Sequence, residues 1–129
     1  MRGIMGAQEE AMAKITNFRD LDVWKLGKAV TLEVYAATKS FPRDERFGLM
    51  AQMRRAALSI PANVAEGFNC YHNKEYRQFL YVALGSCAEL ETQIEVSGDL
   101  GYVDRSTQGR LLEQLDHESR MLRNLIKRL

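Results

Sequence analysis

The stretch Gln52-Met-Arg-Arg-Ala-Ala-Leu-Ser-Ile-Pro-Ala-Asn-Val-Ala-Glu-Gly67 is the part of the chain around which we expect the fold to be organised. Its composition is typical of a helix, yet Pro61 stands in its middle. A proline inside a helix has no backbone N–H, and its ring crowds the carbonyl four residues earlier, here that of Ala57. The same segment places polar side chains among small and apolar residues, at Ser59, Asn63 and Glu66. Such polar groups need hydrogen-bond partners, so the stretch predicts a helix with a backbone break and a polar cluster.

The composition is that of a folded domain. A chain of 129 residues fits one domain that can bury its own core. Hydrophobic residues make up 46% and charged residues 27%, which argues against a disordered chain. Eighteen Lys and Arg residues oppose 17 Asp and Glu, a net charge of +1. The surface as a whole is therefore not basic, and any contact with nucleic acid must depend on local clusters.

The remaining totals concern location and cysteine chemistry. Cys70 and Cys87 alone make neither a disulfide framework nor a zinc site. No apolar run approaches the roughly 20 residues that span a membrane. Residues 1–17 contain two adjacent glutamates and lack the apolar core of a signal peptide. We expect a flexible N-terminal extension over 1–17, one domain over 18–129, and a cytoplasmic location.

Four segments show helical periodicity. The first follows an acidic cap at Asp20 or Asp22 and ends before Ser40-Phe41-Pro42, because the residue before proline avoids the helical region. The second begins at Asp44-Glu45 and ends at Gly67, which we expect to adopt a left-handed backbone there. The inward positions of these two helices are Val23, Leu26, Val30, Val34 and Ala37, then Phe47, Met50, Met53, Ala57, Ile60 and Val64.

The third helix is capped by Asn73 and ends at Gly98 to Gly101, and Gly85-Ser86 in its middle predicts the close approach of a neighbouring helix. The fourth is capped by Asp104 and runs to Leu129. The inward stripe of this last helix consists of Leu111, Leu112, Leu115, Leu122, Leu125, Ile126 and Leu129, interrupted by Ser119. No segment alternates as a strand would. The sequence therefore predicts an all-α protein, an antiparallel up-down-up-down four-helix bundle.

The sequence contains no complete motif for catalysis or metal binding. A carboxylate-bridged metal pair in a bundle needs Glu-x-x-His, but His72 and His117 follow Asn69 and Gln114 at that spacing. A nucleophile needs an oriented base, and the pair Cys70 and His72 lacks a third group that could orient it. No glycine-rich phosphate loop is present. We expect a protein that is not an enzyme and that binds no metal or cofactor.

The polar residues of the second helix form one candidate site. Ser59, Asn63 and Glu66 share a helical face, and Glu89 on the third helix is a possible neighbour. We expect Arg54 or Arg55 to hold Glu66 or Glu89, with Asn63 as a bridge, since a buried carboxylate needs a cation or several donors. Such a network would set helix register and bend. A ligand or catalytic pocket, or partial exposure without a role, are the alternatives.

Basic residues form the other candidate site. Cations cluster near the chain end, at the start of the third helix beside Tyr71, His72 and Tyr76, and in the second helix: Arg120, Arg123, Lys127 and Arg128, then Lys74 and Arg77, then Arg54 and Arg55. Basic residues interleaved with aromatics suit phosphate contact and base stacking. The alternative is a solvated face whose C-terminal cations offset the helix dipole. A surplus of apolar and aromatic side chains, such as Trp24 and Tyr81, also suggests self-association.

Several ordered motifs of the chain resemble one protein family. They are Phe18-x-x-Leu21-x-Val23-Trp24, the run from Val34-Tyr35 through Phe47-Gly48-Leu49 to the opening stretch, Phe79-Leu80-x-x-Ala83-x-Gly85-Ser86-x-x-Glu89-Leu90-Glu91, and Leu100-Gly101-Tyr102. The family is the bacterial four-helix-bundle family first noticed in intervening sequences of large-subunit ribosomal RNA genes. It is related in fold to the accessory variability determinant of diversity-generating retroelements. The resemblance covers residues 18–129.

The resemblance implies an up-and-down protomer and a ring-like homo-oligomer, typically a pentamer. For the retroelement relatives it implies binding of nucleic acid and of a reverse transcriptase through a basic surface; for the intervening-sequence members it implies no established activity. The retroelement members look strongly basic, whereas this chain carries +1. The resemblance assigns no chemistry to Ser59, Asn63, Glu66 or Glu89.

The sequence thus predicts a non-enzymatic homo-oligomer that binds the phosphate backbone of RNA or DNA, or a nucleoprotein partner such as a reverse transcriptase. A purely structural or protein–protein interaction ring without nucleic-acid binding is the alternative. No membrane partner is expected.

Overall fold

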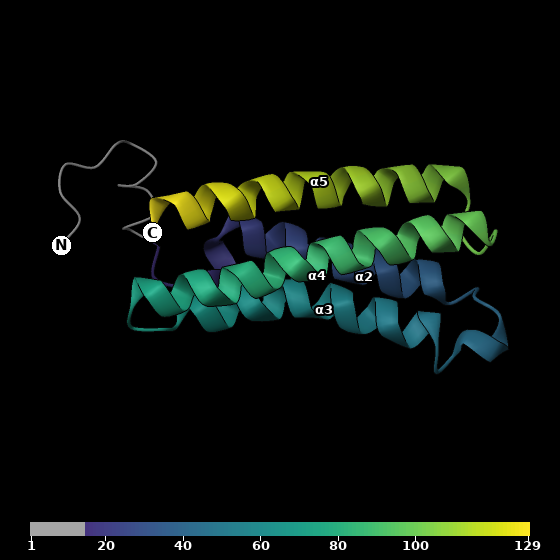
Figure 1. Cartoon of the computed structure of the whole chain (residues 1–129), viewed down its shortest axis with the longest axis horizontal. Helices are drawn as coiled ribbons and strands as arrows, with labels where there is room; N and C mark the ends of the chain where they lie inside the picture. Colours follow the sequence, from purple (N-terminus) through teal and green to yellow (C-terminus); the bar gives the residue numbers. More distant parts are fainter. Residues whose placement is uncertain (1–14) are drawn as a thin grey trace.

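The computed structural model describes residues 15–129, and all of its long elements are helices (Figure 1). In chain order they are the 3-10 turn η1 (Phe18–Asp20), α2 (Asp22–Thr38), the 3-10 turn η2 (Arg43–Glu45), α3 (Leu49–Phe68), α4 (Asn73–Asp99) and α5 (Arg105–Arg128). The prediction of four helices without a strand is confirmed for these residues. Residues 1–14 of the extension predicted over 1–17 lie outside the described part of the chain.

The helix starts show which capping predictions were right. Asp104 caps α5, since its Oδ1 accepts a 2.7 Å hydrogen bond from the Thr107 backbone N–H. This hydrogen bonding holds the pKa of Asp104 below its ordinary value. The expected caps at Asp20 or Asp22 are wrong: α2 follows Leu21 without a side-chain cap, and Asn17 caps the preceding turn η1 instead. The cap expected at Asn73 is also wrong, because α4 has no side-chain cap.

The start of α3 differs most from the prediction. The turn η2 takes up Arg43–Glu45, and α3 begins only at Leu49, whose N–H donates to Glu45 Oε1 over 3.2 Å. Phe47 therefore precedes the helix instead of opening its inward stripe, and it is exposed. Gly67 is likewise not a terminator, because α3 continues to Phe68 and Gly101 is the one glycine with positive φ among the described residues.

Gly67 instead lets two helices approach closely. A Cβ added there would lie 2.9 Å from the Phe79 Cβ and 2.9 Å from the Tyr76 Cδ1 on α4. Side chains at that distance cannot coexist without movement, so a residue with a Cβ would push α3 and α4 apart. Of the pair Gly85-Ser86, for which a close approach was predicted, Ser86 contacts α3, since its hydroxyl lies 2.9 Å from that of Ser59. Gly85 makes no such contact, because no atom lies within 4 Å of a Cβ added there.

The core fills the space between the four helices, which lie side by side along the long axis of the molecule (Figure 1). Each helix contributes residues of its predicted stripe, and the largest fully buried apolar side chains are Met53, Ile60, Leu80, Leu90, Ile94, Leu111, Leu115 and Leu122. One charged residue, Glu118 of α5, is buried as completely as these. The sequence reading did not place it in the core.

Pro61 lies inside α3, as the opening stretch predicted, and its side chain is buried. The Ala57 carbonyl, which has lost the N–H donor of residue 61, accepts a hydrogen bond from Thr31 Oγ1 of α2 over 3.0 Å. The same hydroxyl lies 2.8 Å from the Gly27 carbonyl on its own helix, so its single proton is shared between two acceptors. A neighbouring helix thus supplies the donor that the proline removed.

Candidate nucleic-acid interface

The start of α4 and the end of α5 bring six of the predicted cations to one end of the molecule. Arg77 near the start of α4 donates a hydrogen bond to the main-chain oxygen of Leu129. We call the set around this contact the C-terminal basic cluster; it consists of Lys74, Arg77, Arg120, Arg123, Lys127 and Arg128. Arg77 and Arg128 are half-buried, while the other four members are exposed. The start of α4 and the end of α5 therefore meet at one end of the molecule.

The exposed members differ in how far their charge is neutralised. Arg120 pairs with Asp116 one turn earlier at 3.2 Å, and both side chains face solvent, so the pair is weak. Within residues 15–129 no ion pair involves Lys74, Arg123 or Lys127. Three cations are thus available to an anionic ligand, and Arg120 is available after exchange of a surface partner.

An aromatic side chain adjoins this cluster. Tyr71 is 93% exposed in the connection before α4, and its ring meets that of His72 edge-on at 5.0 Å. The neighbouring Cys70 donates its thiol hydrogen to the Glu66 carbonyl, and burial and the Glu75 carboxylate raise its pKa. Both effects disfavour a thiolate, so this end of the molecule suits binding better than nucleophilic attack.

Arg54 and Arg55 lie elsewhere, near the start of α3, at the opposite end of the molecule from the start of α4 (Figure 1). Arg54 closes the end of α2: its Nε donates to Thr38 Oγ1 over 2.8 Å, its Nη2 donates to the Tyr35 carbonyl over 3.2 Å, and its guanidinium lies 4.6 Å from the Tyr35 ring centre. Arg55 is exposed and contacts Gln52. Both arginines were candidates for the polar network and for nucleic-acid contact. Arg54 instead stabilises the contact between α3 and the end of α2.

The polar network of α3 contains three neutral side chains. The Ser59 and Ser86 hydroxyls meet at 2.9 Å across the contact between α3 and α4, and Asn63 Nδ2 donates to the Ser59 carbonyl and hydroxyl. Glu66 and Glu89 are exposed and lie outside this network. The expected pairing of either acid with Arg54 or Arg55 is not formed, since both arginines contact other residues. Along α3 the two arginines precede Glu66 by about three turns, which is too far for an ion pair on the same helix.

The structure contains a second basic and aromatic cluster that the sequence did not predict. The turn η2 presents Arg43, Arg46 and Phe47, all exposed, which we call the η2 cluster. Phe47 is 87% exposed, and the Arg46 guanidinium lies 5.4 Å from the centre of its ring. The alternation of Arg and aromatic residues in the turn was the available signal. It was missed because Phe47 was assigned to the inward stripe of α3.

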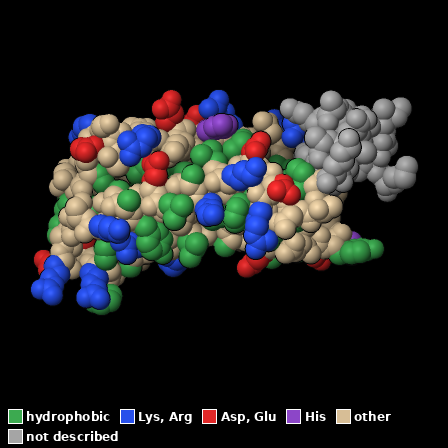
Figure 2. All heavy atoms as spheres, turned by 180° about the vertical axis from the view of Figure 1, so that it is seen from behind, with side chains coloured by type: hydrophobic (Ala, Val, Ile, Leu, Met, Phe, Trp, Pro, Cys, Tyr) green, Lys and Arg blue, Asp and Glu red, His purple; other side chains and the backbone are tan. Residues whose placement is uncertain are grey.

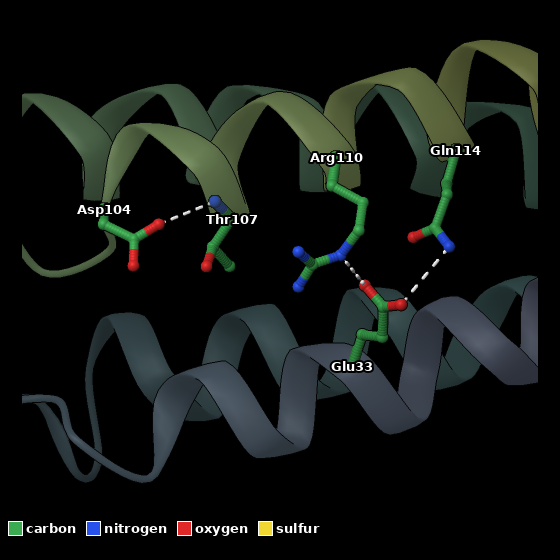
Figure 3. Close-up of polar contacts among 5 residues, drawn as sticks. All are labelled: Glu33, Asp104, Thr107, Arg110 and Gln114. Atoms are coloured by element: carbon green, nitrogen blue, oxygen red, sulfur yellow. Dashed lines mark hydrogen bonds and ion pairs between the residues drawn. The ribbon is translucent and has the colours of Figure 1, made fainter.

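The contact between α2 and α5 carries its own polar groups (Figure 3). Glu33 accepts from Arg110 Nε and from Gln114 Nε2, each over 3.3 Å. One turn further along α5, Glu118 is fully buried, and neither of its carboxyl oxygens has a hydrogen-bond partner in the described part of the chain. Its Oε2 lies 3.0 Å from where a Cβ on Gly27 would be. Burial raises the pKa of Glu118 to about 8.

Residues 15–129 contain neither a membrane-spanning helix nor a cluster of metal ligands. No helix there is both long and apolar enough to span a membrane. No group of three or more His, Cys, Asp or Glu side chains could hold a metal ion.

Comparison with known proteins identifies a family and similar solved structures. The profile of the family described as 23S rRNA-intervening sequence protein matches residues 19–124. A crystal structure of a protein of unknown function from the S23 ribosomal protein family of Bacteroides thetaiotaomicron is similar with a TM-score of 0.74 and 19% sequence identity, over 81% of this chain and 98% of that chain. At this identity the likeness shows a shared fold alone. No curated protein sequence matches the chain.

Proposed function

The chain belongs to the 23S rRNA-intervening sequence protein family, and from this premise we propose that it is a non-enzymatic helical bundle that binds the phosphate backbone of RNA or DNA. The observation that carries the proposal is the C-terminal basic cluster, where Lys74, Arg123 and Lys127 are exposed without an ion pair in residues 15–129. Tyr71 beside them offers a ring to an unpaired base.

The expected mode of binding is electrostatic. Lysine and arginine side chains that contact phosphates release condensed counterions, and the contacts position the partner without reading its sequence. The net charge of +1 supports a local interface of a few contacts, not a wrapped nucleic acid. A small number of phosphate contacts predicts modest affinity with a shallow but measurable dependence on salt.

We further propose that the helices run up-down-up-down and that copies assemble into a ring, as in a pentamer. Apolar side chains on the outer faces of α3 and α4 support this, because Leu58, Val82 and Val96 are exposed. On the same helices Arg55, Glu66 and Glu89 are exposed with opposite charges. We propose that these charges pair between copies, since none of the three forms an ion pair within residues 15–129. A nucleoprotein partner such as a reverse transcriptase would then meet several basic clusters at once.

The second candidate is an interaction ring that binds no nucleic acid. The exposed apolar side chains favour it as much as they favour assembly itself. In this case the only role of the C-terminal basic cluster would be to keep the start of α4 and the end of α5 solvated.

Fluorescence anisotropy with labelled RNA and DNA distinguishes the two candidates. We expect the wild-type protein to bind single-stranded RNA at about 50 mM salt and to lose affinity at about 200 mM. The double variant Arg123→Glu/Lys127→Glu should bind at least tenfold more weakly. The matched control Lys25→Glu/Lys28→Glu changes the net charge equally on exposed positions of α2 and should bind nearly as the wild type. If the wild-type protein binds no nucleic acid at low salt, the interaction ring is the remaining candidate. Sedimentation equilibrium would then measure the mass of that ring.

A further inference from the structure

We propose that the η2 cluster is a second nucleic-acid contact, in which Phe47 stacks on an unpaired base of a single strand while Arg43 and Arg46 contact the flanking phosphates. The inference rests on the proposed function but uses none of the residues of the C-terminal basic cluster. It lies at the other end of the molecule, where η2 and the start of α3 are found (Figure 1).

The turn that carries Phe47 is rigid. Successive backbone hydrogen bonds, from Glu45 N–H to the Pro42 carbonyl at 2.9 Å, from Arg46 N–H to the Arg43 carbonyl at 3.1 Å and from Gly48 N–H to the Glu45 carbonyl at 3.0 Å, hold its shape. The Glu45 carboxylate accepts from the Leu49 N–H and from the Tyr102 hydroxyl. The outward position of Phe47 therefore belongs to an ordered turn.

The side chains of this turn divide into an inner and an outer set. Phe41 is buried and packs on the Tyr102 ring at 5.2 Å between centres, so one aromatic of the segment anchors it to the bundle. Phe47 is 87% exposed, so the other is presented to solvent. A single exposed apolar residue is common on protein surfaces and decides nothing by itself.

The charges near Phe47 indicate what kind of ligand would bind there. Arg43, Arg46 and Lys39 are exposed, and the Arg46 guanidinium lies 5.4 Å from the Phe47 ring centre. Of the two acids in the turn, Glu45 directs its carboxylate inward to its two donors, which leaves Asp44 as the exposed one. In Figure 2 this end of the molecule, away from the grey residues, shows Lys and Arg side chains projecting beside hydrophobic ones. An exposed aromatic ring beside an arginine, in a segment with two further exposed cations, complements an anionic ligand with planar apolar rings.

Nucleic acid with unpaired bases has that chemistry. Bases stack on aromatic side chains, arginine adds cation–π and phosphate contacts, and the interaction tolerates any sequence because each base has a π-face. Bases inside a duplex are already stacked, so a protruding ring reaches them only in single strands, loops or ends. The η2 cluster therefore predicts a preference for single strands over duplex of the same length.

The experiment uses a labelled oligouridylate of about eight nucleotides, within the site sizes of known single-strand binding folds, and the Arg123→Glu/Lys127→Glu protein. This background weakens binding at the other end of the bundle, so that the remaining affinity depends mainly on the η2 cluster. Phe47→Leu should weaken binding roughly 5- to 150-fold, the range expected for one lost base stack. Phe47→Trp should retain or improve the affinity, and Tyr81→Leu, which changes an exposed aromatic of α4 outside both clusters, should leave it unchanged.

The possible outcomes separate the two proposals. If the wild-type chain binds the oligonucleotide but Phe47→Leu and Phe47→Trp bind alike, the inference at η2 is wrong while the proposed function stands. If the wild-type chain binds no nucleic acid at low salt, the proposed function fails and the inference fails with it. A change of oligomer mass in Phe47→Leu without a change in oligonucleotide binding would show that Phe47 contacts protein instead, which overturns the inference. Circular dichroism melting of each variant confirms that the bundle remains folded.

Discussion

The contact between α2 and α3 and the contact between α2 and α5 each bury a polar group, and they treat it in opposite ways. Between α2 and α3, the Ala57 carbonyl that Pro61 leaves without a donor receives one from Thr31 at 3.0 Å. Between α2 and α5, the Glu118 carboxyl faces Gly27 and has no partner in residues 15–129. Thr31 and Gly27 lie one turn apart on the same helix. One turn of α2 thus separates a satisfied polar group from an unsatisfied one.

The two contacts differ because a buried carboxyl group can become neutral by binding a proton, whereas a carbonyl has no charge to neutralise. A peptide carbonyl is neutral at every pH, so its unmet hydrogen bond must be supplied by another group. A carboxyl can instead hold its proton, and the raised pKa of Glu118, about 8, means that it does so at neutral pH. Burial is the cause of this shift, and within residues 15–129 neither a hydrogen bond nor an ion pair holds the carboxyl group. Cys87 of α4 lies near it with a pKa that burial raises to about 12, Glu91 of α4 is another acid, and Arg123 of α5 is exposed.

The largest predicted effect is a pH dependence confined to the contact between α2 and α5. The ordinary pKa of Glu118, 4.5, applies when the chain is unfolded, and the value near 8 applies when it is folded. Between these values the folded state binds one proton more, so the free energy of unfolding should fall by about 1.4 kcal/mol for each pH unit of increase. The loss begins above the unfolded value and levels off above the folded value, and it amounts to several kcal/mol.

Urea denaturation between about pH 5 and pH 9 measures this loss, with the Glu118→Gln variant as the comparison, since an amide does not titrate in this range. The variant should be more stable than the wild type at pH 8 and should lose most of the slope. Asp104, whose pKa is lowered, contributes only at more acidic pH. Parallel pH profiles of the two proteins would contradict the assignment of a neutral carboxyl at Glu118.

A smaller effect is predicted for the satisfied contact. Thr31→Val keeps the shape of the side chain but leaves the Ala57 carbonyl buried without a donor, so it should lower stability by about 1 to 3 kcal/mol. In the Pro61→Ala background the N–H of residue 61 can donate to that carbonyl again, and the same substitution should matter less. A double-mutant cycle measures the coupling between the two positions. Thr38→Val, another buried threonine of α2, should have the same effect in both backgrounds; additivity of Thr31→Val with Pro61→Ala would disprove the repair.

How far the sequence predicted these features depends on whether the contacts are local. The Asp104 cap involves a residue three positions away, so the residue pattern alone was sufficient. Pro61 predicted that the Ala57 carbonyl would lack a backbone donor. The donor could not be predicted, because Thr31 belongs to α2, and the register of α2 against α3 follows from packing. Glu118 continues the spacing of Leu111, Leu115 and Leu122, which is an inward position. Its place in the polar run from Asp116 to Ser119 concealed that spacing.

The candidate sites follow the same division. The C-terminal basic cluster was predictable, because four of its members lie within two to three turns of one helix. The role of Arg54 was not, because it depends on where α2 ends relative to α3. Phe47 was misplaced because the turn η2, which Glu45 and Tyr102 stabilise from a distance in sequence, delays the start of α3.

The smallest predicted effect tests whether Glu118 alone governs the contact between α2 and α5. Glu33→Gln removes the charge that holds Arg110 at 3.3 Å, but the Arg110 side chain is 54% exposed and that of Glu33 33% exposed, so solvent screens the pair. The loss of stability should stay below about 1 kcal/mol. The pH dependence that we assign to Glu118 should remain in the Glu33→Gln variant. Added salt should reduce the difference further. If Glu33→Gln instead abolished the pH dependence of the wild type, the surface pair and not the buried carboxyl would be the titrating element of this contact.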